Sequence, residues 1–180
     1  MRKFNELGLS TSTPLSVNEQ SESKGFTLVE LLLYMGLLLL FLLIQTQILI
    51  SVLGVRLESE ANSAVSQDAR FIMARLIYDI NRAENIILPA IPSAQTNSLV
   101  LIIGGTSHTY LLLGENLIIT NNLGVDNLNS FGTKVSNLSF KRLGNVGGKN
   151  TATVSLTLTS TTQREGGPET RSVQTTGGLR

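Results

Sequence analysis

The chain has 180 residues, a formal net charge of +1 and no cysteine. A chain of this size holds one modest domain. The lack of cysteine excludes disulfides and thiolate zinc sites, and the near-neutral charge without a dense basic patch makes nucleic acid an unlikely partner. Apolar residues are concentrated between Phe26 and Val55, whereas the chain after Asn85 is rich in Asn, Thr, Ser and Gly. Composition therefore separates an apolar N-terminal segment from a polar body.

Residues 1–25 form a polar leader that carries both signs of charge. Its basic residues are Arg2, Lys3 and Lys24, and Lys24 stands directly before Gly25. Because basic residues are favoured on the cytoplasmic side of a membrane helix, the leader is expected inside and the body outside the membrane.

The segment that follows is the most informative part of the chain. Gly25-Phe26-Thr27-Leu28-Val29-Glu30 precedes an apolar run, and no charged residue occurs from Leu31 to Val55. A helix of that length rises about 37 Å, at about 1.5 Å per residue, and a hydrocarbon core is about 30 Å thick. An acidic residue inside such a helix costs roughly 2.5–3.5 kcal/mol, so Glu30 is expected to have a partner. The alternative is a carboxylate at the headgroup boundary, stabilised by the helix dipole.

This hexapeptide with its apolar tail resembles the type IV pilin superfamily signature for processing by prepilin peptidase. The resemblance implies cleavage between Gly25 and Phe26, methylation of the new amino group of Phe26, and pairing of Glu30 with the N-terminus of a neighbouring subunit in a fibre. The leader is longer and less basic than many prepilin leaders. Residues 26–55 are then the transmembrane and fibre-core helix, and residues 56–180 are an extracytoplasmic head.

An amphipathic helix is predicted over residues 56–88, because apolar residues recur there at three- or four-residue spacing. Charged residues, Asp79 among them, are expected largely off this apolar stripe, and Pro89 is expected to end the helix. A helix continuous with the apolar run is favoured over a break at Gly54. The stripe comprises Leu57, Ala61, Val65, Ile72, Leu76, Ile80, Ala83 and Ile87.

The remainder, about residues 99–176, shows β periodicity. Strands are predicted at 99–103, 110–113, 116–119, 135–143 and 151–159, with an edge strand at 171–176. Gly114-Glu115 is a two-residue link with glycine first, as a type II′ hairpin requires. The expected fold class is α+β, with a long N-terminal helix packed on a small antiparallel sheet of four to six strands, as in pilins.

The subgroup resemblance is more diffuse. The segment Phe71–Ala83 is similar to the helix end of J-type minor pseudopilins and of PilW-like minor pilins. The segments Val135–Phe140 and Val154–Leu158 are similar to the last strands of that group. The resemblance implies a minor pilin or pseudopilin of a type IV pilus-like or type II secretion fibre, positioned near the fibre tip.

The partners that this resemblance implies are prepilin peptidase, other pilin or pseudopilin subunits, the inner-membrane assembly platform and membrane lipid around helix 26–55. The implied location is the cytoplasmic membrane, with a single pass, and then the fibre. Two alternatives stay open: a minor pilin of a DNA-uptake or adhesive pilus, and a signal-anchored extracytoplasmic binding domain that never polymerises.

Catalysis and metal binding have little support in the sequence. The single histidine, His108, has no Ser motif or carboxylate pair nearby, and one histidine without cysteine is too few ligands for zinc. Asp126 with Asn121, Asn122 and Asn127 is a weak donor set for Ca²⁺, and turn formation is the favoured interpretation. No enzyme activity and no cofactor are expected.

Overall fold

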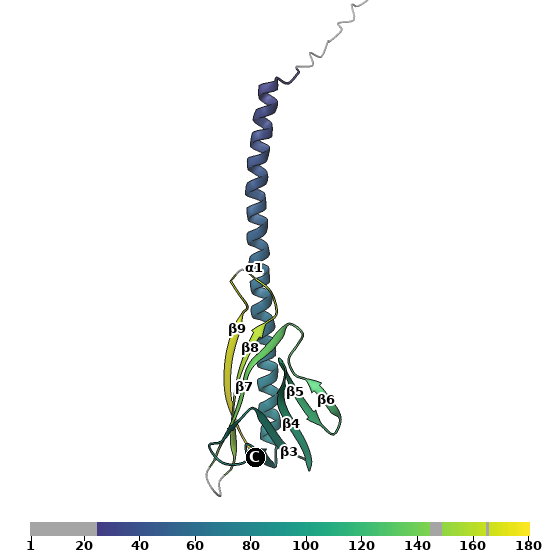
Figure 1. Ribbon diagram of the computed structural model, residues 1–180, viewed down its shortest axis with the longest axis vertical. Coiled ribbons are helices and arrows are strands. Elements are labelled where there is room, and N and C mark those ends of the chain that lie inside the picture. Colours follow the sequence, from purple (N-terminus) through teal and green to yellow (C-terminus); the bar gives the residue numbers. More distant parts are fainter. Residues whose placement is uncertain (1–24, 145–148, 165) are drawn as a thin grey trace, which may run out of the picture. The chain divides into compact units, whose positions relative to one another are not determined.

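The structure is a computed structural model that describes residues 25–144, 149–164 and 166–180. The predicted leader, except Gly25, lies outside the described residues. The described chain contains one helix, α1, followed by nine strands (Figure 1). It divides into an N-terminal unit that ends at Ile44 and a larger unit, Gln45–Arg180, which holds all the strands.

Helix α1 runs from Leu28 to Arg82 as one element of 55 residues. It continues through Gly54, so the alternative of a break at this glycine is wrong. A glycine in a helix interior costs only about 1 kcal/mol relative to alanine. That cost is small beside the continuous backbone hydrogen bonding on both sides of Gly54.

The C-terminal end of α1 lies at Arg82, which corrects the expected end at Leu88. The backbone N–H of Glu84 donates to the carbonyl of Ile102 (2.8 Å), and strand β1 (Asn85–Leu88) then pairs antiparallel with strand β3 (Ser98–Ile103). Strand β3 therefore accepts the backbone hydrogen bond that this segment would have formed within a longer helix. Ile86 follows Ala83 by three residues and both are buried, so spacing alone could not distinguish helix from strand here.

The first sheet has five antiparallel strands in the order β1-β3-β4-β5-β6. Strand β4 (Thr106–Leu113) pairs with β3 and with β5 (Asn116–Asn121), and β5 pairs with the short β6 (Gly124–Asn127). The predicted hairpin at Gly114-Glu115 is present, with Leu113 opposite Asn116. Only the first turn residue, Gly114, has a positive φ (63°), as a type II′ turn requires.

The second sheet has four antiparallel strands in the order β2-β7-β8-β9. They are β2 (Gln95–Thr96), β7 (Thr133–Leu143), β8 (Thr151–Ser160) and β9 (Thr170–Gly178). The predicted apolar face of β8 is confirmed, because Ala152, Val154, Leu156 and Leu158 are all buried, but the alternation is incomplete, because Thr153 is buried as well. The predicted edge strand is also present, as β9.

The strands thus form two sheets instead of the single sheet expected. Figure 1 shows both sheets along the part of α1 in the larger unit, and they approach each other where β7 comes near β3 and β5. One apolar cluster contains residues of the helix and of both sheets. On α1 this cluster comprises Val65, Ala69, Ile72, Leu76 and Ile80.

The two ends of the predicted stripe are exposed, with 38% of Leu57 and 45% of Ile87 accessible.

Strand β9 approaches α1 closely at Gly177, which lies against Ile80. A Cβ at this glycine would stand 3.1 Å from Ile80 Cγ2, which is tighter than nine in ten real contacts. A larger residue at this position would therefore require the Ile80 side chain to shift by a few tenths of an ångström.

Asp79 was expected off the apolar stripe, but only 1% of it is accessible. The buried hydroxyl of Tyr110 donates to Asp79 Oδ2, and Arg75 Nε donates to the same oxygen at 2.8 Å. Burial and then the bond to Asp79 raise the pKa of Tyr110, which keeps its hydroxyl protonated. Asp79 is tolerated in the core because both neighbours are donors.

Replacing Asp79 with alanine should lower the free energy of unfolding by about 2–3 kcal/mol, because the buried Tyr110 hydroxyl loses its acceptor. Urea unfolding of a soluble fragment that begins at Arg56 measures this change. Asp126→Ala removes an exposed carboxylate of β6 and serves as the control, with an expected change below about 0.5 kcal/mol. Equal unfolding midpoints for the two variants would show that the Asp79 contacts do not stabilise the head.

Candidate functional site

Gly25 and Phe26 lie immediately before α1, where both are exposed. Phe26 is 73% accessible, and within the described part of the chain no atom beyond the immediate chain neighbours lies within 4 Å of the position that a Cβ would take at Gly25. The fold therefore has room for a larger residue at position 25. Any requirement for glycine at this position comes from a partner that acts on the chain.

Thr27 caps the start of α1. Its carbonyl accepts a hydrogen bond from the N–H of Leu31 (3.1 Å), and its side-chain Oγ1 accepts one from the N–H of Glu30 (3.2 Å). Thr-X-X-Glu is the pattern of a capping box, in which the threonine oxygen satisfies an N–H of the first turn. The acidic side chain of Glu30 in that turn also suits the positive end of the helix dipole.

The carboxylate of Glu30 has a neutral partner one turn further on. Tyr34 Oη donates to Glu30 Oε1 at 3.3 Å, and the Tyr34 ring makes an edge-to-face contact with Phe26, with centroids 6.2 Å apart. None of the ion pairs among the described residues involves Glu30. Phe26, Glu30 and Tyr34 thus form one local group in which the carboxylate has an uncharged donor and can accept a charged one.

Sequence reasoning identified Gly25, Phe26 and Glu30 but missed Thr27 and Tyr34. The signals for both are local and could have been found. Thr27 stands three residues before Glu30, which is the spacing of a capping box. Tyr34 stands four residues after Glu30, which places the two side chains on one face of a helix.

The apolar part of α1 is suited to a membrane by length and composition. An 18-residue window of the helix has a mean hydropathy of 2.4, and no part of that window is buried within the chain. A soluble protein would cover such a surface with its own side chains. Among the described residues, nothing covers the hydrophobic side chains of this segment, and this is the surface that a membrane-spanning helix presents to lipid.

The other polar residues considered from sequence lie in turns and strands, and among the described residues His108 has a buried Nδ1 without a hydrogen-bond partner. Asn121 Oδ1 accepts the N–H of Leu123 (2.8 Å), so this residue forms the predicted turn, and Asp126 and Asn127 lie in strand β6. His108 lies in β4 opposite Leu101. Within the part of the chain that the structure describes, no three His, Cys, Asp or Glu side chains gather as a metal site would need.

Gly25, Phe26 and Glu30, the three residues expected to carry processing and assembly, all lie in the N-terminal unit, within or just before the first turn of α1. In comparisons with known proteins, no family model, curated protein or solved structure matches this chain. A functional assignment therefore depends on the residues and their geometry.

Proposed function

We propose that this protein is a minor pilin or pseudopilin, a structural subunit and not an enzyme. It is made as a membrane-anchored precursor, cleaved by prepilin peptidase between Gly25 and Phe26, and assembled into a type IV pilus-like or type II secretion fibre. The proposal depends above all on Glu30. Its carboxylate lies one turn from the exposed Gly25-Phe26 bond, at the start of an apolar helix that the rest of the described chain does not cover.

The proposed mechanism is assembly driven by a change of surroundings. Before incorporation, the apolar part of α1 lies in the cytoplasmic membrane, with the head outside. On assembly that surface moves from lipid to a bundle of helices, so the hydrophobic contribution changes little. The interaction that distinguishes the fibre is electrostatic: the freed amino group of Phe26 on one subunit pairs with Glu30 of its neighbour.

Several features support this pairing. Glu30 accepts only the Tyr34 hydroxyl among the described residues, which leaves acceptor capacity for a cation. A charged pair in a low-dielectric bundle is strongly dependent on geometry, so it sets the register of neighbouring subunits. Tyr34 and Thr27 hold the carboxylate and the start of the helix in place for that contact.

Replacing Glu30 with valine should leave membrane insertion and cleavage intact, because removal of a charge makes insertion easier. Incorporation into fibres or minor-subunit complexes should fall at least about tenfold, since a hydrogen bond to a charged group contributes about 1.5–3 kcal/mol. The measurement is the amount of processed subunit in sheared fibres or purified complexes, with N-terminal sequencing to show a start at Phe26.

Glu60→Val is the matched control, because Glu60 is an exposed glutamate of the same helix in the head. It should assemble as the wild type does. Wild-type incorporation of Glu30→Val would refute the register role. An intact Met1 on the wild-type protein would favour the alternative of a non-polymerising anchored domain.

A further inference from the structure

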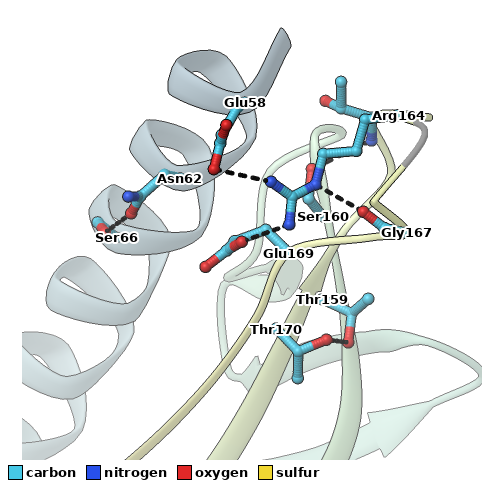
Figure 2. Close-up of polar contacts among 10 residues, drawn as sticks. Glu58, Asn62, Ser66, Thr159, Ser160, Arg164, Gly167, Glu169 and Thr170 are labelled. Atoms are coloured by element: carbon cyan, nitrogen blue, oxygen red, sulfur yellow. Dashed lines mark hydrogen bonds and ion pairs between the residues drawn. The ribbon is translucent and has the colours of Figure 1, made fainter. Parts of the chain in front are cut away.

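The loop between β8 and β9 is tied to α1 by one arginine. Figure 2 shows the guanidinium of Arg164 directed toward the helix, with Glu58 and Glu169 near its terminal nitrogens and Gly167 on the opposite side. A terminal nitrogen of Arg164 donates to Glu169 Oε2 (2.7 Å), and Nε donates to the carbonyl of Gly167 (2.6 Å). The other terminal nitrogen only approaches Glu58 Oε1, at 3.5 Å. The loop contacts are therefore tight, and the contact with the helix is loose.

A groove of about 540 Å³ lies between this loop and α1. Its size is within the range of about 300–1,000 Å³ that is common for ligand pockets. The helix side of the groove is apolar except for Glu58, and Arg164 is the charged residue on the loop side. Its lining comprises Ile50, Leu53, Gly54, Leu57, Glu58, Arg164 and Gly166.

The groove lies where the uncharged run ends. Ile50 and Leu53 belong to the run without charge that extends to Val55, and Glu58 is the first acidic residue after it. For a helix that crosses a bilayer with this run, the same positions mark the passage from hydrocarbon to headgroups. One end of the groove then faces acyl chains and the other faces phosphate and amine groups.

The charges of the groove select among lipid headgroups. Among the described residues that line the groove, Glu58 and Arg164 carry opposite charges, and Arg164 is already paired with Glu169, so a headgroup that carries both signs of charge fits better than an anion with no cation of its own. A guanidinium has five donors, and the loose approach to Glu58 leaves donors of Arg164 free for a phosphate oxygen. The Glu58 side chain is 67% accessible and can accept hydrogen bonds from an ammonium group.

We propose that this groove binds one zwitterionic phospholipid whose headgroup carries a primary ammonium, as phosphatidylethanolamine does. Its phosphate contacts Arg164, its ammonium contacts Glu58, and the first part of an acyl chain lies along Ile50 and Leu53. This inference rests on the membrane-spanning part of the proposed function and is independent of cleavage and of fibre assembly.

Native mass spectrometry of the full chain, released from detergent with equal amounts of three lipids, tests the proposal. Phosphatidylethanolamine should be retained as a single bound molecule. Phosphatidylcholine, whose quaternary amine has no N–H to donate, and phosphatidylglycerol, which has no cation, should each be retained about tenfold less, the scale of one charged hydrogen bond.

Two variants test the position of the site. Gly54 has open space where a Cβ would stand, so Gly54→Leu fills the groove without a clash inside the chain and should abolish selective retention. Gly36→Leu is its control, since Gly36 has the same open space but lies outside the groove. Glu58→Gln should reduce the preference for phosphatidylethanolamine about tenfold, whereas Glu60→Gln should leave it unchanged.

Equal retention of the three lipids, or a preference for phosphatidylglycerol, would overturn the proposal. So would selective retention that persists in Gly54→Leu. Loss of the lipid preference with normal processing and assembly would refute this site alone. Conversely, a chain that retains phosphatidylethanolamine but is never cleaved would keep the site and refute the pilin assignment.

Discussion

Replacing Gly25 with tryptophan should leave the full-length precursor in the membrane, with cleavage reduced at least about 100-fold. The indole beside the scissile bond keeps the peptidase from approaching the backbone closely. A displacement of about 1 Å at a reacting bond is enough to lower the rate about 100-fold. The chain itself offers no resistance to the substitution, because the space around Gly25 is open. A loss of cleavage would thus report on the peptidase and not on folding.

Immunoblotting of membranes separates precursor from mature chain, and N-terminal sequencing identifies the cut. Gly36→Trp is the control, since this glycine also has open space but lies eleven residues further along the helix. It should be processed normally. Mature-length protein from Gly25→Trp would place the cleavage site elsewhere.

A fragment that begins at Leu99 should not fold, whereas one that begins at Arg56 should be soluble, with both helix and strand. The shorter fragment loses the α1 residues that share one apolar core with both sheets, and it also loses strands β1 and β2. Each large apolar side chain that becomes exposed costs about 1.5–3 kcal/mol. The fragment lacks Ile72, Leu76 and Ile80, so the buried side chains of both sheets that share their core become exposed, and these include Leu101, Tyr110, Phe140, Leu156 and Leu158. The summed cost is as large as the whole stability of an ordinary domain, about 5–15 kcal/mol.

Circular dichroism and size-exclusion chromatography of the two fragments measure this difference. Leu76→Ala in the longer fragment removes only part of the helix contribution to the core and should lower the free energy of unfolding by about 2–5 kcal/mol. Phe71→Ala provides the matched control, because Phe71 lies on the exposed face of the same helix, and should change stability by less than about 0.5 kcal/mol. A cooperatively unfolding, monomeric Leu99 fragment would show that the sheets do not need the helix.

Features encoded within short segments could be predicted from the sequence. The Gly25–Glu30 motif and the uncharged run are linear patterns, and the structure places them at the start of α1 as expected. The apolar face of β8 and the glycine-first turn at Gly114 follow from side-chain period and from φ preference, which act over a few residues. Thr27 and Tyr34 belong to the same class, since their contacts with Glu30 span one turn.

What only the tertiary structure decided depends on partners far apart in the chain. The end of α1 at Arg82 depends on Ile102, whose carbonyl takes the N–H that a longer helix would have used. The burial of Asp79 depends on Tyr110 of β4, and the groove depends on Arg164 reaching Glu58. No local period encodes these pairs, because a helix face or a strand has the same spacing whichever segment covers it. By itself the sequence determined the apolar helix, the Gly25–Glu30 motif at its start and most strands, whereas the folded chain decided the division into two sheets, the buried carboxylate and the groove beside Arg164.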